Sequence, residues 1–206
     1  MPIPPDQSSL QADITRAAGL IKSGGLVAYP TDTVYGIGCD PRNANAAARL
    51  FEAKAREGSR ASPLIGASIE QLSHAVEFTD IARRLAASFW PGPLSLVLQA
   101  KPGISRLVLG GLETAAVRVP ADETARSLAN AVGFAITATS ANVSGQPPVA
   151  RASLLSERLL AHLDFVLDGG TRSAGAVSTI VDVTGDVPRL VRAGVTAWER
   201  VLESLR

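Results

Sequence analysis

Residues 26–38 read Leu-Val-Ala-Tyr-Pro-Thr-Asp-Thr-Val-Tyr-Gly-Ile-Gly, and the fold class can be worked out from this stretch and its flanks. The apolar run from Leu26 to Tyr29 is closed by Pro30, which predicts a short buried strand that ends in a tight loop. The β-branched residues and two glycines of 31–38 predict a second strand after the loop. Two strands joined by a polar, glycine-containing turn are therefore expected.

Helical patterns flank this pair of strands. Before it, Ser8 and Gln11 form a capping box, and apolar residues recur at helical spacing up to Gly24 and Gly25. After it, Asn43 can cap an alanine-rich helix. Further along, helices are predicted at 68–76, 79–89, 122–132 and about 196–205, and strands at 63–68, 94–99, 115–119, 134–139, 165–167, 178–183 and 189–191. This alternation predicts an α/β fold around one mixed sheet, because several late strands lack intervening helices.

The length of 206 residues and a hydrophobic content of 46% favour a single domain over 1–206, with 1–7 as a flexible tail. No apolar run approaches the roughly 20 residues that a membrane span needs, and Met1 to Gln7 does not resemble a signal peptide. A cytoplasmic protein without membrane contact is expected. The single cysteine, Cys39, excludes an internal disulfide and is interpreted as a small buried hydrophobe.

The formal charge of +1 gives no global field that would attract nucleic acid, so any anion must be bound locally. The chain contains no GxxxxGKS loop, no GxGxxG, no HExxH and no GxSxG, which excludes the common nucleotide-binding and hydrolase signatures. His74 and His162, the only histidines, lie far apart in the sequence, and this argues against a histidine-dependent triad or a histidine-rich metal site.

Three polar, glycine-bearing or hydroxyl-rich segments follow or interrupt apolar strands, at 29–36, 139–145 and 177–180. Hydroxyls and backbone amides at strand ends can bind phosphate or a small polar ligand. Ordinary turns use the same residue types, so one such segment alone would indicate only a turn. Three of them, together with spaced arginines, favour a binding site.

Eight sequence blocks identify a resemblance that runs from about Gly24 to Gly194. They are PTDTVYGIG at 30–38, FEAKAR at 51–56, SPLI at 62–65, FWPGPLSLVL at 89–98, AVRVP at 116–120, SANVSG at 140–145, STIVD at 178–182 and VRAG at 191–194. In composition and order these blocks resemble the YrdC-like threonylcarbamoyl-AMP synthase family, in its short, single-domain form. One block alone would be weak, but eight in order make coincidence improbable.

The resemblance implies a twisted open mixed sheet flanked by helices, with a deep concave cavity. It also implies a nucleotidyltransferase that forms threonylcarbamoyl-AMP and pyrophosphate from L-threonine, bicarbonate and ATP, for threonylcarbamoyladenosine modification of tRNA. Mg²⁺ would be held through the ATP phosphates, with no metal site made by the protein. Threonylcarbamoyl-transferase proteins would act downstream, and tRNA or double-stranded RNA would be a further partner.

The resemblance also assigns roles to individual residues. Lys54 and Arg56 match a basic pair that would hold the ATP phosphates and are the catalytic candidates. The threonine-binding candidates are Thr33, Arg118 and Ser178. The ATP-binding candidates are Lys54, Arg56, Ser62, Thr114, Ser140, Asn142, Ser144 and Arg192. Because exposed cavity charges contribute little stability, Lys54→Ala and Arg56→Ala are expected to abolish ATP use without unfolding the chain.

This sequence departs from the family pattern at four positions: Ser62 replaces an asparagine, Ala67 a histidine, Pro148 a serine and Val177 a glutamate. Two other functions stay open. One is an RNA-binding module, against which the aromatic content of 4% counts. The other is a related enzyme that adenylates a different carbamate or carbamoyl phosphate, with the same ATP pocket and a different amino-acid pocket.

Overall fold

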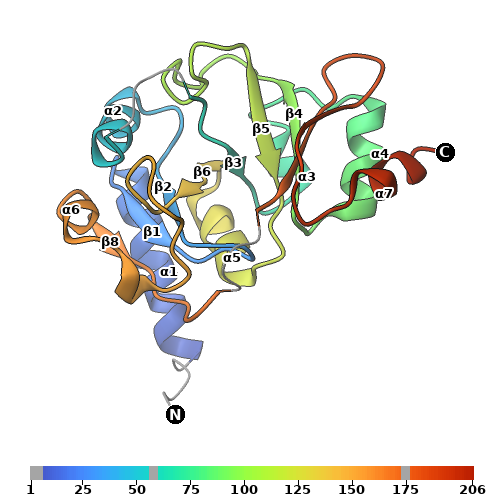
Figure 1. Ribbon diagram of the computed structural model, residues 1–206. Helices are drawn as coiled ribbons and strands as arrows, with labels where there is room; N and C mark the ends of the chain where they lie inside the picture. Colours follow the sequence, from blue (N-terminus) through green and yellow to red (C-terminus); the bar gives the residue numbers. More distant parts are fainter. Residues whose placement is uncertain (1–6, 56–59, 173–176) are drawn as a thin grey trace.

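The structure is a computed structural model that describes residues 7–55, 60–172 and 177–206 (Figure 1). The predicted α/β class with mixed strand directions is confirmed. The expectation of one sheet is wrong, because the described strands divide between a four-stranded and a six-stranded sheet. Cys39 is buried, as predicted.

The four-stranded sheet contains both strands of the 26–38 stretch. Its order is β7-β2-β1-β8, made by Thr139–Ser140, Gly36–Gly38, Val27–Tyr29 and Phe165–Val166. Strand β1 runs antiparallel to β2 and parallel to β8. The strand, tight loop, strand prediction for 26–38 is therefore confirmed.

The six-stranded sheet has the order β10-β9-β4-β5-β3-β6. Its strands are Arg189–Arg192, Thr179–Asp182, Leu94–Gln99, Thr114–Arg118, Leu64–Ile65 and Ile136–Thr137. Strand β4 lies at the centre, antiparallel to β5 and parallel to β9. The alternation of Leu94, Leu96 and Leu98 places these side chains in one hydrophobic core, so the residues between them face the other side of the sheet.

The helices begin close to their predicted positions. They are α1 (Gln7–Lys22), α2 (Ala44–Ala53), α3 (Ile69–Leu72), α4 (Asp80–Phe89), α5 (Glu123–Val132), α6 (Glu157–Leu160) and α7 (Trp198–Glu203), with a 3₁₀ turn at Ala152–Leu154. The side chains of Asn43, Thr79 and Asp122 cap α2, α4 and α5. None of the helices among the described residues is long and apolar enough to cross a membrane.

Helix α3 is shorter than the predicted helix at 68–76. Ser68 caps it, but it ends at Leu72, and Val76 forms a β-bridge with Ala100 instead. This long-range pairing of Val76 with Ala100 thus outweighs the local helical pattern of residues 73–76. Elsewhere, α1 and α5 pack together over β1 in a second hydrophobic cluster, and α2 packs against the four-stranded sheet in a third (Figure 1).

Residues 136–140 cross from one sheet to the other. The sequence predicts one strand at 134–139, but Ile136–Thr137 pairs with β3 in the six-stranded sheet, and Thr139–Ser140 pairs with β2 in the four-stranded sheet. Ala138 therefore lies at the seam between the sheets. The segment that follows, 140–145, begins at this seam.

The Tyr35 hydroxyl joins the 26–38 stretch to residues 168–170. It lies 2.9 Å from both Asp168 Oδ1 and the Gly170 carbonyl, and it accepts from the Gly169 N–H at 3.1 Å. Burial, with a contribution from Asp168, raises the pKa of Tyr35 to about 12. The neutral phenol is thus the form that this network stabilises.

We expect Tyr35→Phe to lower the free energy of unfolding by about 1–3 kcal/mol, because it removes the hydrogen bonds of a buried tyrosine hydroxyl, one of them to the Asp168 carboxylate. Tyr29→Phe is the matched control, since the buried Tyr29 hydroxyl makes one bond, to the Thr137 carbonyl. Urea unfolding of both variants measures the difference. Equal losses for the two variants would contradict the importance of the 168–170 network.

Candidate functional site

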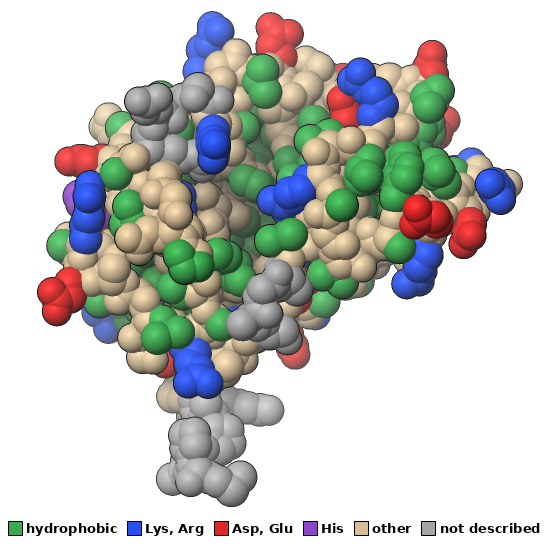
Figure 2. Space-filling model, in the orientation of Figure 1, with side chains coloured by type: hydrophobic (Ala, Val, Ile, Leu, Met, Phe, Trp, Pro, Cys, Tyr) green, Lys and Arg blue, Asp and Glu red, His purple; other side chains and the backbone are tan. Residues whose placement is uncertain are grey.

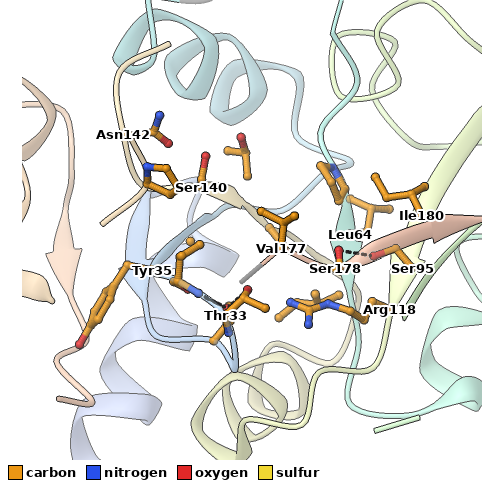
Figure 3. A pocket seen from close by; sticks show the side chains of 18 of the residues that line it. Thr33, Tyr35, Leu64, Ser95, Arg118, Ser140, Asn142, Val177, Ser178 and Ile180 are labelled. Carbon is orange, nitrogen blue, oxygen red and sulfur yellow. Dashed lines mark hydrogen bonds between the residues drawn. The ribbon is translucent and has the colours of Figure 1, made fainter. Parts of the chain in front are cut away.

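A cavity of about 390 Å³ opens at the seam between the two sheets. Figure 2 shows the face of the molecule hollowed near its middle, with basic side chains close to the opening. Residues of the 31–36 turn and of β7 line one side, and residues of β3, β4, β5 and the β9–β10 pair line the other (Figure 3). A cavity of this volume is typical of a site for small molecules.

Arg118, the last residue of β5, forms a buried ion pair with Asp32. Its Nη1 lies 2.7 and 2.8 Å from the two carboxylate oxygens, and the side chains of Arg118 and Asp32 are 7% and 13% exposed. Asp32, in the turn after β1, is thus the partner of Arg118. The pair uses Nη1, and the other N–H groups of the guanidinium are available to a ligand carboxylate.

Arg192, the last residue of β10, also lies on the cavity wall. Its guanidinium donates two bonds to the Ser178 carbonyl, at 2.7 and 3.1 Å, and one to Ser178 Oγ at 3.0 Å. Burial, and then the positive charge of Arg118, lower the pKa of Arg192. Two arginines close enough to interact favour binding of an anion between or beside them.

Lys54 is another cation of the cavity wall and is only 4% exposed. Its ammonium donates to the carbonyls of Ser140 and of Asn142, the latter at 2.7 Å, and its own carbonyl accepts from the Ser144 N–H at 3.0 Å. Lys54 therefore holds the 140–145 segment in place. The expectation that Lys54→Ala leaves folding intact assumed an exposed charge, and that assumption is wrong, because Lys54 is buried. A loss of stability is therefore expected for this variant.

Hydroxyl and amide groups complete the wall. Thr33 Oγ1 lies 3.0 Å from Thr31 Oγ1, and the Asn142 amide donates to backbone carbonyls of 143 and 146. Among the described residues, Asn142 Oδ1 is buried without a hydrogen-bond partner. Such an orphaned acceptor is suited to a donor from a bound ligand.

The structure brings most of the predicted site residues to one cavity: Thr33, Lys54, Arg118, Ser140, Asn142, Ser144, Ser178 and Arg192. Arg56 lies outside the described residues. Two candidates are not on the cavity wall. Ser62 is buried between wall residues, and Thr114 begins β5, four residues or about 13 Å along the strand from Arg118.

Sequence reasoning missed Ser95, which lines the cavity from β4. The signal that could have found it was a serine between two leucines in a predicted strand, since a polar residue inside an apolar run indicates a specific hydrogen-bond partner. Tyr35 is also on the cavity wall. Its hydroxyl points away from the cavity toward residues 168–170 (Figure 3).

The profile of the Sua5_yciO_yrdC family, described as telomere recombination, matches residues 19–194. The chain belongs to this family. It is 42% identical over 186 residues to the threonylcarbamoyl-AMP synthase of Pyrococcus abyssi, covering 90% of this chain and 55% of that protein. It is 39% identical over 174 residues to the threonylcarbamoyl-AMP synthase of Idiomarina loihiensis, covering 83% of this chain and 94% of that protein.

A solved structure of the same family, P. abyssi Sua5 complexed with L-threonine, superposes with a TM-score of 0.90 at 40% identity. The match covers 95% of this chain and 58% of that one. The chain thus spans little more than half the length of the P. abyssi protein, but nearly the whole length of the I. loihiensis protein. The YrdC-like fold implied by the eight sequence blocks is confirmed.

Among the described residues of this Sua5/YciO/YrdC family member, no group of three or more His, Cys, Asp or Glu side chains is arranged to hold a metal ion. Asp32, the carboxylate beside the cavity, already pairs through both oxygens with Arg118. The described wall thus contains cations and hydroxyls rather than a carboxylate cage. Such a wall suits substrates that carry carboxylate and phosphate groups.

Proposed function

We propose that this chain is an L-threonylcarbamoyladenylate synthase, which converts L-threonine, bicarbonate and ATP into threonylcarbamoyl-AMP and pyrophosphate. The observation that supports it most directly is the convergence of Lys54, Arg118 and Arg192 on one cavity lined by hydroxyls. The names of the relatives, one of which this chain matches over nearly its whole length, support the same activity.

The reaction needs charge stabilisation and positioning more than a protein nucleophile. The threonine amine attacks the bicarbonate carbon, and loss of water gives a carbamate. A carbamate oxygen then attacks the α-phosphorus of ATP, and the bond to the bridging oxygen breaks as pyrophosphate leaves. Each reactant carries a negatively charged group, so the main task of the site is to hold these groups together.

The cavity residues suit these tasks at different places. Arg118 and Thr33, which face the cavity from its two sides, would hold the threonine, with the remaining N–H groups of Arg118 on its carboxylate. Ser140, Asn142 and Ser144 would line the phosphate path, shaped by Lys54. Arg192 would contact the nucleotide from the rim. ATP would arrive as its magnesium complex, with the metal held by phosphate oxygens as part of the substrate.

The product carries an activated carbamoyl group. Separate transferase proteins in the cytoplasm would use this product to transfer the threonylcarbamoyl group onto tRNA. Direct contact with tRNA or double-stranded RNA is the further partner proposed from the family resemblance. The near-neutral net charge of +1 means that such contact would depend on local basic side chains.

Pyrophosphate release by the purified chain tests the proposal. With MgATP and bicarbonate, we expect release that depends on L-threonine, and a product of the mass of threonylcarbamoyl-AMP. Release without threonine dependence would indicate a related adenylating enzyme with another substrate. No release, together with salt-sensitive RNA binding, would indicate a binding module instead.

A further inference from the structure

Ser95 is a polar residue inside the apolar run 94–98 of strand β4. Its neighbours Leu94 and Leu96 point into the hydrophobic core, so the alternation of β4 turns Ser95 to the face that lines the cavity. The residue is 3% exposed. A serine buried to this extent needs a hydrogen-bond partner to offset the loss of water.

The partner of Ser95 is Ser178, whose Oγ lies 3.0 Å from Ser95 Oγ (Figure 3). The backbone around Ser178 is fixed from two directions. The Thr179 N–H donates to the Pro93 carbonyl at 3.0 Å, and the Val195 N–H donates to the Val177 carbonyl at 3.0 Å. A Cβ at Gly194 would lie 2.5 Å from the Ser178 carbonyl carbon, so only glycine allows this close approach.

The donors and acceptors around Ser178 Oγ leave two directions for its proton. A serine hydroxyl has one donor and two acceptor sites. Arg192 Nη2 can only donate, and at 3.0 Å it takes one acceptor site of Ser178 Oγ. If Ser95 donates to the second site, both acceptors are filled, and the Ser178 proton is left for an acceptor atom in the cavity.

The alternative is that Ser178 donates to Ser95, which would leave an oxygen lone pair facing the cavity. That orientation suits a ligand donor. Ser178 and Ser95 lie on the same side of the cavity as Arg118, and the cations there favour a ligand oxygen that carries negative charge (Figure 3). The first orientation is therefore the one that matches the electrostatics of the site.

We propose that Ser95 is a positioning residue for the amino-acid substrate, acting by donating to Ser178 so that the Ser178 hydroxyl donates to the substrate carboxylate. This inference rests on the proposed synthase function. It assigns Ser95 no contact with the nucleotide. Ser95→Ala should therefore weaken threonine binding without weakening ATP binding.

Isothermal titration with L-threonine and, separately, with MgATP tests the inference on the purified chain. We expect Ser95→Ala to raise the Kd for L-threonine about five- to tenfold, the effect of one hydrogen bond, and to leave the Kd for ATP within about twofold. Ser95→Thr, which keeps the hydroxyl, should bind threonine as the wild type does. The double variant Ser95→Ala with Ser178→Ala should bind no more weakly than Ser178→Ala alone, because Ser95 acts through Ser178.

L-Threoninamide, which lacks the carboxylate charge, is a second probe, and its Kd should differ little between the wild type and Ser95→Ala. Ser73→Ala, which changes a half-buried serine after α3 and outside the cavity wall, is the matched control and should leave both affinities unchanged. Thermal melting verifies that each variant is folded. If Ser95→Ala does not fold, Ser95→Cys provides the same test, since a thiol keeps the volume but donates weakly.

If the wild type binds threonine and a folded Ser95→Ala variant binds it equally well, the role of Ser95 is overturned, and the proposed synthase function is not affected. Additive losses in the double variant would also overturn it, because Ser95 would then act independently of Ser178. A wild type that binds ATP but not threonine would overturn the proposed function, and the inference with it.

Discussion

Arg118→Ala is expected to reduce threonine-dependent pyrophosphate release at least about 100-fold and to destabilise the fold. The loss of activity follows from removing the proposed contact to the substrate carboxylate, a charge-assisted bond that alanine cannot replace. The loss of stability follows from Asp32, whose buried carboxylate would keep no ion-pair partner. Breaking one side of such a pair costs about 3–5 kcal/mol. Initial rates and urea unfolding measure the two effects.

The double variant Arg118→Ala with Asp32→Ala separates these effects. Removing the carboxylate as well eliminates the unpaired buried charge, so we expect most of the lost stability to return. Activity should stay at the level of Arg118→Ala. Recovery of activity in the double variant would show that Arg118 serves only to neutralise Asp32, and this would contradict its proposed role in binding threonine.

Lys54→Met is expected to lower both stability and ATP use. Methionine keeps much of the side-chain volume but leaves the carbonyls of Ser140 and Asn142 without the ammonium that they accept from. We expect a loss of about 2–3 kcal/mol in the free energy of unfolding. Because the 140–145 segment would lose its support, the KM for ATP should rise at least about tenfold.

Lys22→Met is the matched control, because Lys22 is exposed at the end of α1 and the substitution is the same. It should change neither stability nor the KM for ATP by more than the measurement error. A Lys54→Met variant that kept wild-type stability but lost ATP use would indicate that Lys54 acts mainly on the phosphates. Wild-type behaviour in both measurements would exclude Lys54 from the site.

Local pattern was sufficient to predict most elements of the fold. Caps such as Asn43 and Thr79 and the proline-bounded strand at 26–29 are encoded by neighbouring residues, so their positions follow from short-range physics. The order of the eight family blocks added the fold type and most residues of the cavity. Strand pairing was harder to predict from the sequence, because it joins residues far apart in the chain.

The sequence by itself determined the α/β class, the helix caps and the set of hydroxyls and cations from which the site is built. Only the tertiary structure decided how they are arranged. Residues 136–140 look like one strand in sequence, yet they pair with two different sheets and so create the seam where the cavity lies. The partners Asp32–Arg118, Lys54 with the 140–145 carbonyls, and Ser95–Ser178 are 83 or more residues apart. Contacts at that separation depend on how the sheets pack, and no local pattern in the chain encodes them.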